Sequence, residues 1–479
     1  MGTSKGSVVG RQPAPRTASS TWRGQIDSHQ NISHDSIAGL GYDWSKVADP
    51  DIAPRYPFKV YLARSTADVA AAIKETNQLG QRLHVRSKGH SSNDLVLAEG
   101  GAVLLTQLMD EIGDFDPEAG RITVQAGATN AAADDYLAER GYGLPVVGDH
   151  KDITVGGFIS LGGISPCSHR TGLFIEHVIE LEYVDWQGEI HRCGPNLDPD
   201  QYWAVAGGMG RAGVITQATL EVIRIDKYRT VLLNESARFD SFEAYLRGTR
   251  SLLAGVGEDA YAARGMWLDL GKRAMGQFST YRCTDQAGLK KVADTVSYGA
   301  LHGVGLLAGT VPPSVDKVLK LAGMAGVLYS PKYATMKNVE FFTDKLIDTT
   351  VGDPTRMLIA LIPLSAYEEL IAKLWELLTG FRHRHGCFTF LSCYVKGIAS
   401  PYLGDERVAE VTFLLGIRAG AFPDSLLATL VEQFDSLVIE HSAMRYMHTR
   451  TIPDPERRAL IDPNLRYAAR TAQRSTSQA

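Results

Sequence analysis

A single histidine lies inside a turn built from small and polar residues. His90 stands in the string Arg-Ser-Lys-Gly-His-Ser-Ser-Asn-Asp, residues 86–94, directly after residues 82–85, which read as a short buried strand. Gly89 permits a sharp turn, and its small neighbours let several backbone N–H groups point at one anion, with Lys88 adding positive charge. A diphosphate suits such a turn, and His90 then lies beside whatever group the diphosphate carries. Taken alone, the string is also compatible with a surface turn.

Two further glycine-rich segments follow this turn. Residues 153–165 contain the pairs Gly156-Gly157 and Gly162-Gly163, and residues 202–216 contain the spacing G-x-G-x-x-G between Gly208 and Gly213. That spacing matches the dinucleotide fingerprint of a Rossmann fold. However, it follows a helical pattern and leads into a strand at residues 213–222, whereas Rossmann glycines follow a strand and open a helix. The sequence therefore argues against a Rossmann domain.

Short elements must position the first turn. Residues 58–62 predict a strand, and residues 65–77 predict a helix with Ser65 as N-cap and Asp68 in its first turn. Together with the strand at 82–85 they form a β-α-β unit. Further strands are expected at residues 102–105, 121–125 and 178–184, and a helix at 131–140.

The pattern changes from about residue 228 to longer alternating strands and amphipathic helices. Two similar sets are expected, which favours a second domain whose sheet has helices on one face. The first set comprises strands at 228–233, 262–270 and 277–283 and a helix at 242–254. The second set comprises strands at 356–362, 387–394 and 408–417 and a helix at 367–378, followed by a helix at 425–434 and a strand at 437–439. Residues 301–345 between the sets read as a glycine- and proline-punctuated insert, with a lid or a partner-facing surface as its expected role.

Composition limits the class of protein. A chain of 479 residues predicts two or three domains, and a net charge of −5 with a pI near 6.2 gives no electrostatic case for nucleic acid or an anionic membrane as partner. The five cysteines are odd in number and lack a C-x-x-C pair, which favours a reducing compartment, so a cytoplasmic location is expected. The N-terminal stretch has no apolar core of a signal peptide, and no membrane insertion is expected.

The glycine-rich segments, in this order, resemble a known family: FAD-linked oxidoreductases of the vanillyl-alcohol-oxidase or para-cresol-methylhydroxylase type. Gly89-His90-Ser91 after a strand is similar to that family's flavin-attachment turn, and residues 153–165 resemble its second flavin-cradling segment. Residues 178–190 resemble the strand pair that follows, and residues 202–216 resemble the closing signature. Within the family, the spacing most resembles cytokinin dehydrogenases, gulonolactone oxidases and decaprenylphosphoryl-ribose oxidases. The resemblance to berberine-bridge-type enzymes is looser, because the second flavin tether, a cysteine, is replaced here by His150.

The resemblance implies FAD as cofactor, with one covalent link through His90 and the adenine end held near Val214 and Ile215. Cys167 lies beyond the paired glycines and cannot supply a second link. The residues expected to bind FAD are Arg86, Ser87, Lys88, Gly89, His90, Ser91, Ser92, Asp149, Thr154, Gly156, Gly157, Ser160, Gly163, Ile164, Gly213, Val214 and Ile215.

A hydride-transferring flavin needs a base for the proton that the substrate loses. Asp149 occurs seven residues before Gly156, the position at which cytokinin dehydrogenases carry their catalytic aspartate. A turn acid is the plain alternative, and Asp152 and His150 are local rivals. Lys396 is similar in position to the active-site lysine of decaprenylphosphoryl-ribose oxidases, and Tyr446 and His448 alternate as residues on one face of a strand. All four (Asp149, Lys396, Tyr446 and His448) are therefore candidate catalytic residues.

No metal site is expected. The alternating histidines of residues 383–387 offer a metal-like spacing, but a basic cluster also suits the end of the preceding helix.

The resemblance implies an α+β protein with a PCMH-type FAD-binding domain and a substrate domain built on an antiparallel sheet covered by helices on one face. The expected parts are a flexible arm at 1–40, the FAD domain at 41–226, the substrate domain at 227–440 and a C-terminal return to the FAD domain at 441–479. Because the chain ends soon after Tyr467, the last flavin contact is expected to be incomplete.

The expected function is removal of hydride from an alcohol, an amine or an activated C–H bond of a small molecule, in natural-product biosynthesis. The electron acceptor is dioxygen or another oxidant. The alternative is a flavin-retaining cyclase or isomerase with no net redox change, and a third reading is a binding scaffold with a vestigial flavin fold. The sequence leaves open whether the chain forms a homodimer.

Overall fold

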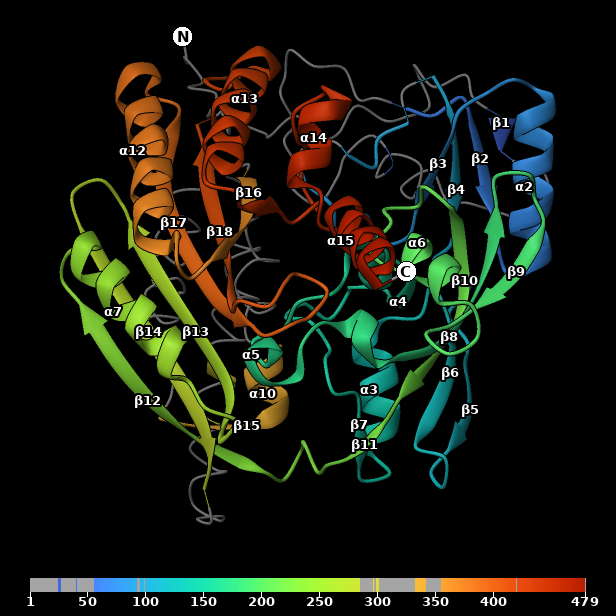
Figure 1. Ribbon diagram of the computed structural model, residues 1–479, viewed down its shortest axis with the longest axis horizontal. Helices are drawn as coiled ribbons and strands as arrows, with labels where there is room; N and C mark the ends of the chain where they lie inside the picture. Colours follow the sequence, from blue (N-terminus) through green and yellow to red (C-terminus); the bar gives the residue numbers. More distant parts are fainter. Residues whose placement is uncertain are drawn as a thin grey trace, which may run out of the picture.

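The computed structural model describes residues 25–26, 40, 56–92, 95–98, 100–284, 296, 299–300, 332–341, 355–418 and 420–478. Most of the expected arm at 1–40 and most of the insert at 301–345 lie outside these residues. The described elements form an α+β fold in which a four-stranded, a five-stranded and a two-stranded sheet lie on one side and an eight-stranded sheet on the other (Figure 1). Among the helices of the described residues, none is long and apolar enough to cross a bilayer.

A small parallel sheet carries the first turn. Its strand order is β1-β2-β4-β3, and α2 (Thr66–Gln78) connects β2 to β3. Ser65 accepts from the Asp68 N–H while the Asp68 carboxylate accepts from the Ser65 N–H, so the predicted helix start is confirmed. β4 lies between the two strands of the predicted β-α-β unit. The strands are β1 (Gln25–Ile26), β2 (Lys59–Leu62), β4 (Ala102–Leu105) and β3 (Leu83–Arg86).

An antiparallel five-stranded sheet carries the other two glycine-rich segments. Its order is β5-β6-β10-β8-β9, and helices α3 to α6 lie between its strands in the sequence. The sheet strands are β5 (Ile112–Asp116), β6 (Arg121–Gln125), β10 (Gly213–Glu221), β8 (Val178–Asp185) and β9 (Ile190–Cys193). The helices are α3 (Asn130–Ala138), α4 (Val155–Leu161), α5 (Ser168–Thr171), the 3-10 helix η3 (Phe174–His177) and α6 (Pro199–Val205), and β7 (Tyr142–Gly143) pairs with β11 (Ile223–Arg224).

The large sheet has eight strands, all paired antiparallel, in the order β15-β12-β14-β13-β17-β18-β16-β19. Three long helices, α7, α12 and α13, cover one face and share a buried apolar core with it (Figure 1). The strands are β15 (Tyr333–Thr335), β12 (Val231–Phe239), β14 (Ala274–Cys283), β13 (Ala260–Asp269), β17 (Phe388–Ile398), β18 (Val408–Ile417), β16 (Thr355–Pro363) and β19 (Met444–Arg445). The helices are α7 (Phe242–Gly255), α12 (Tyr367–His385) and α13 (Asp424–Glu440).

Strand alternation decides which side chains face the helices. On β17, Leu391, Cys393 and Val395 belong to the core shared with the helices, so Ser392 and Tyr394 between them point to the opposite face. That opposite face looks toward the glycine-rich segments, and the two halves share a second buried core. They are also joined by a buried ion pair in which Lys227 Nζ lies 2.9 Å from Asp134 and 2.8 Å from Glu340.

The C-terminal segment returns to the side of the glycine-rich segments. α14 (Pro455–Ile461) and α15 (Pro463–Gln478) follow β19, and α15 lies beside α6 (Figure 1). The Asn464 side chain donates to the Trp203 carbonyl at 2.7 Å, which fixes this return.

One predicted strand is wrong. Residues 437–439 are part of α13, which runs without interruption to Glu440, although their apolar and β-branched character favours a strand. Val438 is fully buried four residues after Phe434, so helical spacing places both side chains in the core under the sheet. Tertiary packing thus outweighs local propensity. Helix α12 also runs past residue 378 to His385 and ends at Gly386, whose φ of +60° gives the left-handed cap.

Candidate active site

A cavity of about 470 Å³ lies between the glycine-rich segments and the open face of the large sheet. It brings together five separate parts of the sequence with predicted roles: residues 86–91, residues 149–164, residues 213–215, Lys396, and Tyr446 with His448. Of the predicted cofactor residues, Ser92 and Gly163 lie outside the lining, and the remaining ones line the cavity. The four candidate catalytic residues Asp149, Lys396, Tyr446 and His448 also line it.

The first turn begins where β3 ends. Gly89 has a φ of +72°, and a Cβ at this position would lie 2.5 Å from Nη2 of Arg86. A larger residue would therefore be strained and would displace the buried Arg86 guanidinium. The glycine brings the backbone of the turn, with Ser87 and His90, against the cavity.

The other glycine-rich segments approach the cavity just as closely. A Cβ on Gly156, in the first turn of α4, would lie 2.8 Å from the Ala126 Cβ at the end of β6. A Cβ on Gly213, at the start of β10, would lie 2.2 Å from the Val184 carbonyl oxygen. Both glycines allow backbone to lie where a side chain would otherwise stand, so the cavity wall is largely backbone at these points.

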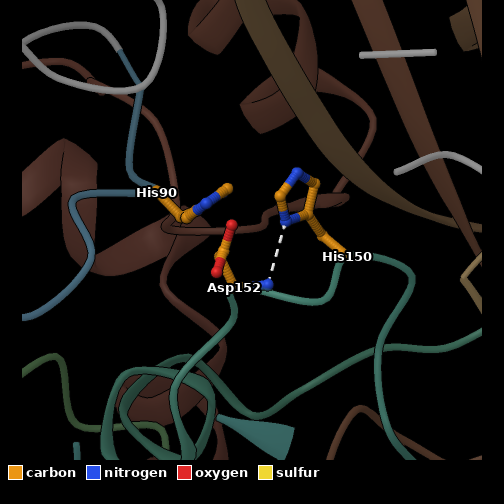
Figure 2. A group of neighbouring side chains, drawn as sticks. All are labelled: His90, His150 and Asp152. Atoms are coloured by element: carbon orange, nitrogen blue, oxygen red, sulfur yellow. Dashed lines mark hydrogen bonds between the residues drawn. The ribbon is translucent and has the colours of Figure 1, made fainter. Parts of the chain in front are cut away.

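Three polar side chains from two loops meet at one edge of the cavity (Figure 2). The ring centroids of His90 and His150 are 4.0 Å apart, and the backbone N–H of Asp152 donates to Nδ1 of His150 at 3.2 Å. One ring nitrogen of each histidine and one carboxylate oxygen of Asp152, atoms that could bind a metal ion, lie within 4.8 Å of one another. The sequence did not predict this grouping. The neighbouring ring of His150 therefore forms part of the surroundings of the predicted attachment residue.

Lys396 is the centre of a charged group that spans the cavity. Its Nζ lies 2.9 Å from Oδ2 of Asp149, in the loop before α4, and 2.9 Å from Oε2 of Glu410, on β18. Burial raises the pKa of the Asp149 carboxyl, but the charge and hydrogen bond of Lys396 outweigh burial and hold that pKa below its ordinary value. Burial lowers the pKa of Lys396, and the two carboxylates raise it above its ordinary value. Asp149 is therefore an ionised carboxylate at neutral pH.

Sequence reasoning missed Glu410. The signal was present, because Glu410 is the one charged residue in the mostly apolar strand β18 and is paired in register with Lys396. Thr412, two residues further along, donates its hydroxyl to Glu410 at 3.0 Å. A buried acid within a core strand indicates a cationic partner on the neighbouring strand.

His448 joins the C-terminal segment to the first turn. Its Nε2 lies 2.5 Å from the His90 carbonyl oxygen, and the Ser92 N–H donates to the His448 carbonyl at 3.3 Å. Because a carbonyl oxygen can only accept a hydrogen bond, Nε2 of His448 carries the proton. Burial lowers the pKa of His448, so the ring is neutral. Its Nδ1 is then an acceptor, and it is buried without a hydrogen-bond partner among the described residues.

Tyr446 stacks on His448, with ring centroids 6.2 Å apart, and burial raises the pKa of its phenol. Both residues lie just beyond β19, which ends at Arg445, so their shared orientation does not come from strand alternation. The two residues were expected to alternate on one face of a strand, but β19 ends at Arg445, before both of them.

Comparison with known proteins gives this cavity a context. Residues 57–194 match the family model of an FAD binding domain. The chain is 32% identical over 194 residues, 40% of its length, to an uncharacterized oxidoreductase of the fasciation locus of Rhodococcoides fascians, and covers 42% of that protein. It is 27% identical over 296 residues, 60% of its length, to cytokinin dehydrogenase 2 of Arabidopsis thaliana, and covers 56% of that protein. It is 29% identical over 188 residues, 36% of its length, to the FAD-linked oxidoreductase easE of Claviceps purpurea (strain 20.1), covering 38% of it. The chain thus spans about half or less of the length of these relatives.

The residues present fit an FAD. The cavity offers backbone at Gly89, Gly156 and Gly213, where added Cβ atoms would collide with their neighbours. Among the described residues, Ser87 Oγ is buried at the cavity without a hydrogen-bond partner. A phosphate oxygen is a suitable acceptor for such a hydroxyl, and backbone N–H groups bind the remaining phosphate oxygens.

Proposed function

We propose that this chain, which contains an FAD binding domain and is a relative of FAD-linked oxidoreductases, removes hydride from an alcohol, an amine or an activated C–H bond of a small organic molecule. The bound FAD supplies the hydride acceptor in such a reaction. The first turn, the loop before α4 and the start of β10 hold the cofactor, with a covalent link through His90. Dioxygen or another acceptor takes up the electrons.

One observation supports this proposal above the others: Asp149 from the cofactor loops and Lys396 and Glu410 from the large sheet meet within 2.9 Å across the cavity. Hydride removal from an O–H or N–H compound leaves a proton that a side chain must accept. A carboxylate held ionised by a lysine at the boundary between cofactor loops and sheet supplies such an acceptor.

In the proposed reaction, Asp149 accepts the proton from the substrate O–H or N–H. Lys396 keeps this carboxylate ionised and in place, because it donates to Asp149 at 2.9 Å while Glu410 fixes the lysine from the sheet. Nδ1 of His448 is a second acceptor at the same cavity, neutral and buried. It accepts a hydrogen bond from the substrate O–H or N–H and so orients the substrate beside Asp149.

An anaerobic titration tests the proposal. The purified yellow protein is mixed without oxygen with a panel of alcohols and amines, and the flavin absorbance near 450 nm, the usual visible band of oxidised flavin, is recorded. A substrate that bleaches the band marks the oxidoreductase. Complete turnover of a substrate without bleaching would instead assign the chain to the cyclases or isomerases that retain the flavin oxidation state. Absence of both bleaching and turnover across the panel would favour a binding role.

A further inference from the structure

The open face of the large sheet is organised in rows of side chains. Directly paired residues of antiparallel strands point to the same side, so each row crosses several strands. Lys396 and Glu410 are paired in the first row. The second row runs through Met266, Tyr394, Thr412 and Ile359. The third row runs through Met275, Leu268, Ser392, Leu414 and Met357.

These rows change from charged to apolar along the strands. The first row holds the ion pair of Lys396 and Glu410 and continues to Leu361 and Met444. The second row mixes one phenol and one hydroxyl with apolar side chains, and the third is apolar apart from Ser392. Phe390 continues the apolar end two residues further along β17 and packs in a small apolar cluster with Leu268. Each row lies about 7 Å beyond the previous one, so Phe390 lies roughly 20 Å from Lys396 along the strand. The cavity lining includes Lys396, Tyr394, Leu414, Met357 and Phe390, so one cavity runs over the whole gradient.

The charged side chains at the polar end pair with one another. Lys396 is flanked by the two carboxylates of Asp149 and Glu410, and Arg264 on β13 adds a second cation whose charge also acts on Asp149. The Lys396 ammonium group already pairs with both carboxylates, and Arg264, which is not part of the cavity lining, donates to the Val339 carbonyl and the Tyr281 hydroxyl, so these charges have partners within the protein. A neutral group that donates and accepts hydrogen bonds, such as a hydroxyl, suits this end better than a phosphate or an ammonium group.

We propose that the substrate is a neutral alcohol with an extended apolar body, an inference that rests on the proposed oxidoreductase function and names its substrate class. The hydroxyl lies at the row of Lys396 and Glu410, next to Asp149. The apolar body lies along the sheet toward Leu414, Met357 and Phe390. Polyols and sugars are poor ligands, because their additional hydroxyl groups lose water at an apolar surface without gaining partners.

The test measures binding apart from turnover. Tertiary alcohols have no C–H bond on the carbinol carbon, so they occupy the site without reaction. Isothermal titration calorimetry of the FAD-loaded protein with 2-methyl-2-propanol and its homologues up to 2-methyl-2-decanol is expected to show affinity rising about threefold to fourfold per added methylene group. Xylitol is expected to bind more weakly than 2-methyl-2-decanol. Affinity that is independent of chain length, or tighter binding of xylitol, overturns the inference.

Two methionines provide a matched pair of variants. Met357 and Met275 lie at opposite ends of the third row, both are half-buried, and only Met357 lines the cavity. Met357→Gln is expected to reduce the affinity for 2-methyl-2-decanol about tenfold and to leave 2-methyl-2-propanol unchanged. Met275→Gln is expected to change neither. Equal effects of the two substitutions contradict the placement of the apolar body.

The two proposals fail in different ways. If primary and secondary alcohols with long apolar bodies bind but do not bleach the flavin, the substrate pocket is correct and the reaction is not. If the flavin is bleached only by short or polyhydroxylated alcohols, the reaction is correct and the substrate class is wrong.

Discussion

Nε2 of His448 donates to the backbone carbonyl of His90 at 2.5 Å, across 358 residues of sequence. This hydrogen bond ties the return of the C-terminal segment to the turn that is expected to hold the flavin. The same turn receives a second tie, because the Ser92 N–H donates to the His448 carbonyl at 3.3 Å. The position of His90 therefore depends on the far end of the chain as well as on the local turn.

His90→Ala should abolish covalent flavin attachment while FAD still binds, because the cradle around the cofactor is mostly backbone. Wild-type protein precipitated with acid should remain yellow and fluoresce on a denaturing gel, whereas the variant should release its FAD into the supernatant. His150→Ala is the matched control, because its ring lies 4.0 Å from that of His90 but is not expected to carry the link. A colourless wild-type pellet would show that the tether is absent.

Asp149→Asn should raise the barrier for flavin reduction by the true substrate by roughly 3–5 kcal/mol. General-base catalysis contributes about 10²–10⁴-fold in rate, and some positioning is also lost. The asparagine keeps the size and part of the hydrogen bonding, so FAD content should be unchanged. Stopped-flow absorbance gives the rate, and Asp152→Asn is the control in the same loop. A variant that reduces its flavin at nearly the wild-type rate would move the role to His448 or Tyr446.

The reduction rate should be nearly independent of pH between about pH 5 and pH 8. Asp149 has a pKa below its ordinary value of 3.8, because Lys396 outweighs the opposing effect of burial, so the base remains ionised throughout this window. The rate should fall only when the pH drops toward and through the lowered pKa. Stopped-flow measurements across this range check the profile. A decline that already begins near pH 6 would indicate a histidine as the proton acceptor.

Lys396→Met should destabilise the protein by about 3–5 kcal/mol, because it leaves two carboxylates at a buried site without their cation. Denaturant unfolding at pH 7 measures the loss. The difference in the free energy of unfolding between variant and wild type should become smaller in acid. The pair of Asp149 and Lys396 contributes its full stability above the unfolded-state pKa of Asp149, and this contribution disappears as the pH falls through the lowered folded-state pKa. Lys373→Met removes an exposed lysine that is paired with Glu369 on α12 and should cost less than about 1 kcal/mol. Equal losses for the two lysines would contradict the central role of Lys396.

His448→Ala should lower the free energy of unfolding by about 1 kcal/mol and loosen the first turn, because one buried hydrogen bond to His90 is lost. Hydrogen exchange should become faster in residues 87–92. His441→Ala is a suitable control, because His441 lies at the end of α13 and does not line the cavity. Unchanged exchange in the first turn would show that the backbone hydrogen bond of Ser92 alone holds it.

Local chemistry was sufficient to predict several features from the sequence. Gly89 has a positive φ, and Gly156 and Gly213 lie where there is no room for a Cβ. Only glycine meets these requirements, so the positions can be recognised in the sequence. Short-range patterns likewise predict three further features: the start of α2 at Ser65, the strand β18, and the strand β10 directly after the glycines of residues 208–213. The resemblance of these segments to FAD-linked oxidoreductases predicted the FAD binding domain, which the family match at residues 57–194 confirms.

Long-range contacts decided the remainder. The partners of Lys396 are Asp149, 247 residues earlier, and Glu410 on a neighbouring strand, and no periodicity in the sequence records either distance. Residues 437–439 carry strand-like side chains but complete a helix, in which Val438 and Phe434 are both fully buried. By itself, the sequence determined where the backbone can turn and which strand faces are apolar. Only the tertiary structure decided which charges meet across the cavity, because their energies depend on burial and on neighbours that the chain brings together in folding.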